Sequence, residues 1–261
     1  MSGLHLHSWG PDDAPAVLVV HGVTNTGARY RRLAQEGLPA HRVLAPDLRG
    51  HGDSTWDPPW GTDAHVADLV DTLDGAGIGR ASVVGHSFGG LLGILLAAAA
   101  PDRVERLALL DPAAAVEPAW AARQAEAVRR DDGWADREEA RAARRALRPP
   151  HAAGTVDEDL DTFLGEDSDG RVRLRFSGPA AITAWSEMAR PAPSLVGYPG
   201  KVLLVPALRD GYLSGALRAA LRRDLGARLR EQGIDAGHML FWDAHEELSA
   251  LLRGFLAEPA A

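Results

Sequence analysis

Short apolar runs alternate along the chain with longer segments in which apolar residues recur at helical spacing. Leu4–Trp9 alternates apolar and polar residues, as a half-buried strand does, whereas Ala16–Val20 is a continuous apolar run. Continuous runs of this length are typical of parallel strands, which are covered on both faces. Further strands are predicted at Arg42–Pro46, Ala81–Gly85, Val104–Leu110, Val202–Val205 and Ala227–Arg230.

The segments between these runs have the spacing and the end signals of helices. Helices are predicted at Val66–Leu73, Phe88–Ala100, Ala216–Leu225 and Ala244–Leu256. Strands that alternate with helices in this way form a parallel sheet with helices on both faces. The pattern therefore predicts an α/β fold with a mostly parallel, doubly wound sheet of about seven strands.

One long segment interrupts this alternation. Residues 113–195 contain no convincing buried strand, and helices are predicted there at Ala119–Arg130, Trp134–Leu147, Glu158–Leu164 and Pro179–Ala189. The strand pattern resumes after this segment, which favours one interrupted domain over two unrelated domains. We therefore expect residues 1–112 and 196–261 to form the core. Residues 113–195 would form a helical cap, inserted after the strand that ends near Leu110, over the carboxyl edge of the sheet.

Composition excludes several classes of protein. The 261 residues include no cysteine, which excludes a disulfide scaffold, cysteine–metal clusters and thiol catalysis. No apolar run reaches the roughly 18 residues of a membrane span, and the amino-terminal residues lack the basic and apolar blocks of a signal peptide. The formal charge of −8 argues against nucleic acid as a partner. We expect a cytoplasmic protein that acts on a small molecule, without a metal or cofactor, and leave its oligomeric state open.

A G-x-S-x-G motif carries the clearest chemical signal. Gly85-His86-Ser87-Phe88-Gly89 lies between a predicted strand and a predicted helix. On such a turn the serine hydroxyl stands above the sheet edge, and bulky neighbours would clash, so glycines flank it. Ser87 is therefore the candidate nucleophile. The backbone amides of Phe88 and of Val23, in His21-Gly22-Val23 at the end of an early strand, are the candidate oxyanion hole.

A serine nucleophile needs a base and an orienting carboxylate. His238 lies in a loop between the last predicted strand and the last helix, so we expect it to be the base. Two carboxylates compete for the orienting role. Asp210 follows the strand Val202–Val205 after a short loop, and Asp111 directly follows the strand Val104–Leu110. We favour Asp210, because Asp111 is followed by proline and is also suited to cap a turn.

Together these pieces resemble the α/β-hydrolase family over nearly the whole chain. The matching segments, in order, are His21-Gly22, Asp47–Ser54, Gly85–Gly89, Pro101–Val104, Asp210 and Gly237-His238. The resemblance implies a serine, acid and histidine in that chain order, a cap after the sixth family strand, and oxyanion amides from Val23 and Phe88. The first family strand is missing here. Two residues depart from the family pattern, because Ala207 and Thr24 replace a common glycine and proline.

The expected reaction is hydrolysis of a small or medium, largely apolar carboxylic ester or lactone through an acyl-enzyme. The same triad also serves carbon–carbon bond hydrolysis, thioester hydrolysis or cofactor-free perhydrolysis, and a non-catalytic ligand-binding or signalling protein on the same fold is a third alternative. Substrate contacts are expected from residues near the predicted strand ends and in the cap. These are His21, Thr24, His86, Trp120, Trp134, Phe163, Trp185 and Met188.

Overall fold

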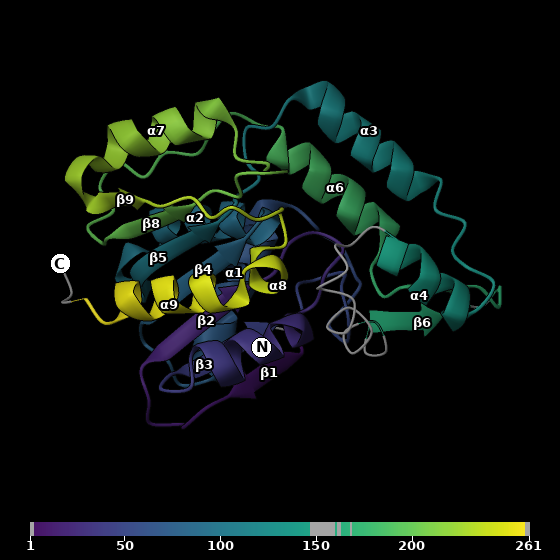
Figure 1. The fold of residues 1–261 in the computed structure, drawn as a ribbon, viewed down its shortest axis with the longest axis horizontal. Coiled ribbons are helices and arrows are strands. Elements are labelled where there is room, and N and C mark those ends of the chain that lie inside the picture. Colours follow the sequence, from purple (N-terminus) through teal and green to yellow (C-terminus); the bar gives the residue numbers. More distant parts are fainter. Residues whose placement is uncertain (1–2, 147–159, 161–162, 168, 259–261) are drawn as a thin grey trace.

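A seven-stranded sheet forms the centre of the molecule (Figure 1). The computed structural model describes residues 3–146, 160, 163–167 and 169–258. The strand order is β1-β3-β2-β4-β5-β8-β9. These strands are β1 (Leu6–Trp9), β2 (Ala16–Val20), β3 (Arg42–Pro46), β4 (Ala81–His86), β5 (Val104–Leu110), β8 (Val202–Val205) and β9 (Leu229–Glu231). Only the pair of β1 and β3 is antiparallel within this sheet, so the predicted mostly parallel sheet of seven strands is confirmed.

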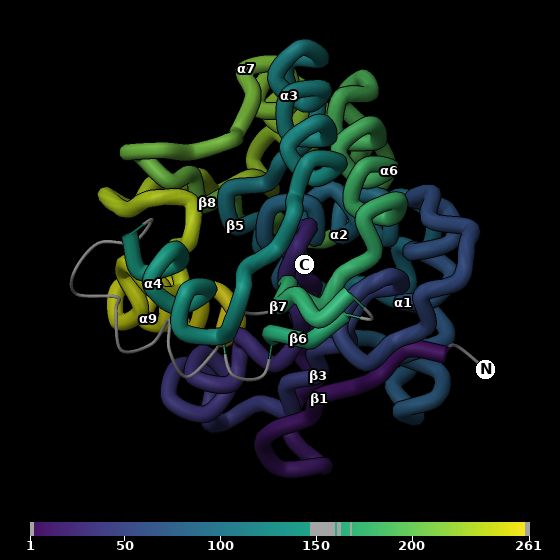
Figure 2. The backbone as a smooth tube through the Cα atoms, turned by 90° about the vertical axis from the view of Figure 1, so that its right-hand side faces the viewer, coloured from purple at the N-terminus to yellow at the C-terminus, as the bar shows by residue number. Residues whose placement is uncertain are grey.

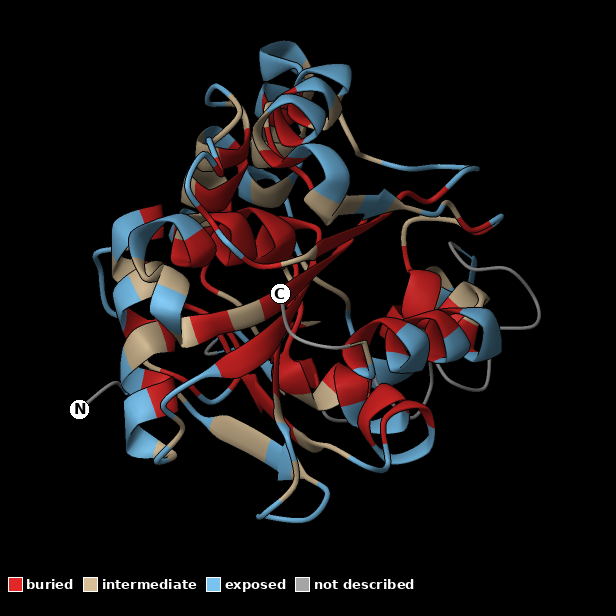
Figure 3. Cartoon of the chain, turned by 90° about the vertical axis from the view of Figure 1, so that its left-hand side faces the viewer, coloured by how far each residue is buried: buried red, intermediate tan, exposed pale blue. Residues whose placement is uncertain are grey.

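Helices cover both faces of the sheet, as expected for a doubly wound fold. On β2, Val17 and Val19 face one apolar cluster, whereas Leu18 and Val20 face the other. The inner strands are therefore buried throughout (Figure 3). The covering helices are α1 (Thr62–Gly75), α2 (Phe88–Ala99), α7 (Gly215–Leu225), α8 (Leu240–Asp243) and α9 (His245–Leu256). None of the described helices has the length and apolar character needed to cross a bilayer.

The segment between β5 and β8 lies to one side of the sheet, on the right in Figure 1 and toward the viewer in Figure 2. It contains α3 (Pro118–Arg129), α4 (Arg137–Ala146), β6 (Leu164–Glu166), β7 (Val172–Leu174) and α6 (Gly178–Met188). The expectation of helices alone is wrong for β6 and β7, which form a separate two-stranded sheet. Each has three residues, too few for an alternating pattern to show. Most of the helix predicted at Glu158–Leu164 lies outside the described residues.

Strand register brings three loop starts to one edge of the sheet. Val20 pairs with Gly85, and Leu110 pairs with both His86 and Val205. The residues that follow β2, β4 and β5 therefore begin at the same carboxyl edge. In open α/β sheets this edge is the usual position of a ligand site.

Candidate active site

Ser87 lies in a strained backbone conformation between β4 and α2. Its φ of 56° and ψ of −119° fall in a region that residues other than glycine rarely adopt, at a cost of about 1–3 kcal/mol. Hydrogen bonds hold the strained residue on both sides. Its amide donates to the Leu110 carbonyl (3.1 Å), and its own carbonyl accepts the amides of Gly90 (2.9 Å) and Ala113 (3.0 Å). The hydroxyl is thereby held at the edge of the sheet.

The two glycines of the motif are required by close backbone packing. A Cβ atom on Gly85 would overlap the carbonyl oxygen of Gly89. A Cβ atom on Gly89 would overlap the carbonyl oxygen of Val20 on β2. The tight passage from strand to helix thus has a steric basis, as the motif predicted.

His238 is bonded to Asp111. Its Nδ1 donates to Asp111 Oδ2 over 2.6 Å, and the Asp111 side chain is fully buried. The same carboxylate accepts the backbone amides of Tyr212 (2.8 Å) and Ala207 (3.3 Å). The buried carboxylate thus accepts three hydrogen bonds, from His238 and from two backbone amides, which offset the cost of removing it from water. With Nδ1 engaged, Nε2 is the imidazole nitrogen left to serve Ser87.

The expectation that Asp210 orients His238 does not agree with this geometry. After β8 the chain keeps pairing with residues 234–236, since the Leu208 amide donates to the Ile234 carbonyl (3.0 Å) and the Arg209 amide to the Ala236 carbonyl (3.1 Å). Asp210 follows this pairing at an exposed position near Gly237, but the His238 Nδ1 bond goes to Asp111. Asp111 instead directly follows β5, the strand beside β4, which places it close to the histidine loop.

Three further side chains hold the His238 loop. The buried His86 Nε2 donates to the His238 carbonyl over 2.9 Å, and burial holds the pKa of His86 well below its usual value. The Tyr212 ring stacks on the His238 ring with centroids 4.0 Å apart and planes 28° apart. Asp243 Oδ2 accepts the Gly237 amide over 3.0 Å. Sequence reasoning missed Tyr212 and Asp243, because no motif marks residues that meet a loop through tertiary contacts.

The loop after β2 passes directly against the nucleophile. A Cβ atom on Gly22 would lie 2.9 Å from Ser87 Cβ and 3.4 Å from Ser87 Oγ, so only glycine fits there. In the described part of the chain, no hydrogen-bond acceptor is found for the Val23 amide or for the Phe88 amide, which opens α2. Both amides are therefore available to an incoming oxyanion.

Two buried histidines shape this loop through backbone groups. His21 Nε2 accepts the Leu48 amide and its Nδ1 donates to the Gly22 carbonyl, each over 2.8 Å. His51 Nε2 accepts the amide of Thr24, which has a φ of 57°. Burial is the main cause that lowers the pKa of His21 to about 3 and that of His51 to about 4. Both rings are therefore neutral near pH 7, and in each ring both nitrogens are hydrogen-bonded to backbone groups.

A cavity of about 500 Å³ opens next to Tyr212, the residue whose ring stacks on His238. It is lined by Val116, Glu117, Trp120, Asp210, Gly211, Tyr212 and Ser214. Tyr212 forms the wall shared with His238, and Trp120 packs edge-on against Tyr212 with centroids 4.8 Å apart. The described residues include no hydrogen bond between the Ser87 hydroxyl and His238. Such catalytic bonds often form only when substrate binds.

The other aromatic and methionine candidates take packing positions. Trp185 is buried and contacts Trp120 edge-on at 5.2 Å. Phe163 and Met188 are fully buried, and Phe163 lies beneath the Arg29 guanidinium. Trp134 exchanges two backbone hydrogen bonds with Val172 of β7. Of this group, Trp120 is the side chain that lines the cavity next to Tyr212.

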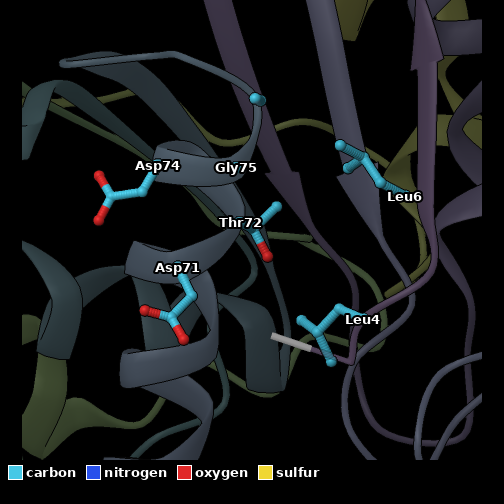
Figure 4. A pocket seen from close by; sticks show the side chains of 7 residues that line it. Leu4, Leu6, Asp71, Thr72, Asp74 and Gly75 are labelled. Atoms are coloured by element: carbon cyan, nitrogen blue, oxygen red, sulfur yellow. The ribbon is translucent and has the colours of Figure 1, made fainter. Parts of the chain in front are cut away.

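A second cavity, of about 370 Å³, lies between β1 and α1 (Figure 4). Leu4 and Leu6 line one side of it, and Asp71, Thr72 and Asp74 line the other. None of the candidate catalytic residues borders this cavity. The candidate active site therefore lies elsewhere, at the carboxyl edge of the sheet.

Comparisons with known proteins agree with the fold and extend over the whole chain. A family profile described as the alpha/beta hydrolase fold matches residues 15–245. The chain is 39% identical over 260 residues to lipase LipV of Mycobacterium tuberculosis, covering 97% of each chain. The structure of E-2-(acetamidomethylene)succinate hydrolase is similar with a TM-score of 0.81 at 21% identity, over 98% of this chain and 95% of the other. A marine microorganism esterase has a TM-score of 0.79 at 17% identity, over 98% and 100%.

Proposed function

Because this chain belongs to the alpha/beta hydrolase fold family, we propose that it hydrolyses carboxylic esters with Ser87, His238 and Asp111 as its catalytic triad. The observation that carries the proposal is the 2.6 Å hydrogen bond between Asp111 and His238, next to a serine on a strained strand-to-helix turn. The 39% sequence identity to a protein named a lipase supports an ester as the bond that is cleaved.

In the acylation step, Ser87 Oγ attacks the ester carbonyl carbon while His238 Nε2 accepts the hydroxyl proton. The carbonyl electron pair moves to oxygen, and Asp111 stabilises the imidazolium that forms. Collapse of the tetrahedral intermediate breaks the bond to the alcohol oxygen, which leaves with the proton from His238. Water then attacks the acyl-enzyme with His238 as base, releases the carboxylic acid and restores Ser87.

The negative charge on the carbonyl oxygen would be held by the amides of Val23 and Phe88. Phe88 opens α2, so its amide also carries the positive end of the helix dipole. Loss of one such donor costs about 2.7–4 kcal/mol of transition-state stabilisation in related chemistry. The close approach of Gly22 to Ser87 supports this placement. The backbone geometry at Ser87 and Val23 would therefore contribute strongly to the rate.

We infer that residues 113–195 act as a cap that selects the substrate. The segment lies beyond one side of the sheet and supplies Trp120 to the cavity next to Tyr212. The aromatic faces of Trp120 and Tyr212 favour a small or medium apolar acyl or alcohol group, or a lactone ring.

The experiment that tests the proposal is active-site labelling with a fluorophosphonate, which reacts with activated serines. We expect wild-type protein to be labelled and Ser87→Ala to be unlabelled, with parallel loss of p-nitrophenyl butanoate hydrolysis. Ser82→Ala, which alters a buried serine on β4, is the matched control and should still be labelled. Labelling that survives Ser87→Ala, or none of the wild type, would overturn the proposed nucleophile.

A further inference from the structure

Two histidines and an aspartate converge at the edge of the sheet, away from the candidate active site. Successive residues of a strand point to opposite faces. Leu4 and Leu6 line the cavity next to α1 (Figure 4), so His5 and His7 lie on the other face. Asp47 follows β3, the neighbour of β1, and its amide donates to the His5 carbonyl (2.9 Å).

The donor atoms of these three residues are close together. His7 Nε2 lies 3.1 Å from Asp47 Oδ1. The rings of His5 and His7 meet edge-on with centroids 4.6 Å apart. One ligand atom from each of the three residues lies within 4.8 Å of the others. The cluster therefore offers two imidazole nitrogens and one carboxylate oxygen to a common point.

We propose that His5, His7 and Asp47 form a binding site for a divalent transition-metal ion of the Zn²⁺ type. Zn²⁺ binds imidazole nitrogen and carboxylate oxygen at about 2.0–2.2 Å, so two ligand atoms at a tetrahedral angle are roughly 3.3–3.5 Å apart. The 3.1 Å between His7 and Asp47 is close to that separation. His5 is exposed, so its ring is free to close on the ion and leave the fourth position to water.

Neighbouring backbone groups hold Asp47 in place as a ligand. Its side chain is almost fully buried, and it accepts the amides of Gly27 at Oδ1 (2.8 Å) and Asp53 at Oδ2 (3.0 Å). These two amides fix the carboxylate so that Oδ1 faces the His7 ring.

The ordinary role of a structural hydrogen bond explains only part of the cluster. It accounts for His7 and Asp47, which lie in hydrogen-bond contact. The His7–Asp47 hydrogen bond does not explain the position of the His5 ring, because His5 bonds Ser54 and Asp47 through its backbone. A third ligand on the open side is the role that fits an exposed imidazole beside this pair. The proposal does not depend on the hydrolytic activity.

The test is calorimetric titration of the full chain with Zn²⁺ near neutral pH, after EDTA treatment and without a polyhistidine tag. We expect saturable binding of one Zn²⁺ per chain, reversed by EDTA and unaffected by excess Ca²⁺ or Mg²⁺, which prefer oxygen ligands. Thermal unfolding should shift upward with Zn²⁺ concentration, because the ion binds the folded chain. Absence of saturable binding would overturn the site.

Variants decide which residues bind the ion. His5→Gln should weaken Zn²⁺ binding by at least about tenfold, because it removes one ligand and leaves the His7–Asp47 bond intact. His41→Gln removes a histidine outside the cluster and is the matched control, with unchanged affinity expected. His7→Gln should abolish binding; if it fails to fold, His5→Gln decides alone. Equal affinity in His5→Gln and His41→Gln would refute the proposal.

Discussion

The imidazole of His238 is fixed by contacts on several sides. Asp111 binds Nδ1, Tyr212 covers one face of the ring, and His86 holds the backbone carbonyl. The Asp243 carboxylate fixes the preceding residue through its amide. Each contact comes from a different part of the chain, so the orientation of the base depends on the folded arrangement. Among these contacts, we expect the bond from Asp111, the proposed triad acid, to have the largest effect on the rate.

Replacing Asp111 by asparagine should therefore lower kcat/KM for p-nitrophenyl butanoate by about a hundredfold or more, because the imidazolium loses its counter-charge and its tautomer is no longer held. Asp210→Asn alters an exposed residue of the cavity wall that is not the partner of His238 Nδ1, and should lower kcat/KM at least about tenfold less than Asp111→Asn does. Steady-state kinetics on both variants, with circular dichroism to confirm folding, checks the prediction. A larger loss in Asp210→Asn than in Asp111→Asn would restore the acid favoured from sequence.

At the scale of elements, α3 reaches the site through one aromatic contact. The Glu117 carboxylate caps α3 by accepting the amides of Ala119 (3.0 Å) and Trp120 (2.7 Å), so the helix begins at a defined residue. Trp120 then packs edge-on against Tyr212, whose ring covers His238. The inserted segment is thereby connected, through Tyr212, to His238, the proposed catalytic base. A change in this contact should affect turnover as well as substrate binding.

Tyr212→Ala should lower kcat by about tenfold or more with a smaller change in KM, because the His238 ring loses the face that holds its orientation. Tyr212→Phe keeps the ring and should stay within about threefold of wild type. Initial rates over a range of p-nitrophenyl butanoate concentrations separate kcat from KM. If alanine and phenylalanine have the same effect, the stacked ring does not position the base.

At the scale of the whole molecule, buried histidines connect the loops around the sheet edge. His21 and His51 meet edge-on with centroids 5.2 Å apart, and His65 on α1 packs edge-on against Phe88 on α2. Burial is the largest cause that lowers the pKa of His65, to about 3. These rings are neutral in the folded protein over a range of pH in which free histidine is protonated. Stability should therefore depend on pH.

The unfolded chain binds protons at these histidines below about pH 6.5, whereas the folded chain binds them only near pH 3–4. The free energy of unfolding should therefore fall between pH 6.5 and 4, by about 1.4 kcal/mol per pH unit for each histidine. Urea unfolding at several pH values measures this slope. His65→Leu should reduce the slope of the free energy of unfolding against pH by about 1.4 kcal/mol per pH unit, the contribution of one histidine. An unchanged slope would contradict the lowered pKa of His65.

Much of the fold was readable from sequence because its signals are local. The apolar runs at Ala16–Val20, Arg42–Pro46, Val104–Leu110 and Val202–Val205 are strands over those same residues. Each is a short, mostly apolar run, because both faces of an inner strand are covered. The short strands β6 and β7 and the four-residue helix α8 were missed, because so few residues carry no period.

The sequence by itself determined the strands, the turn at Ser87 and the position of His238 in a loop before the last helix. These features depend on neighbouring residues: the period of apolar positions and the glycines that a tight turn requires. Tertiary structure decided that His238 bonds Asp111 and not Asp210, and it decided the contacts of Tyr212 and His86. Those depend on which strands lie side by side and how far each loop continues its pairing. In the order β4-β5-β8, the residue after β5 bonds the His238 ring, while pairing continues after β8 and leaves Asp210 at an exposed position near Gly237.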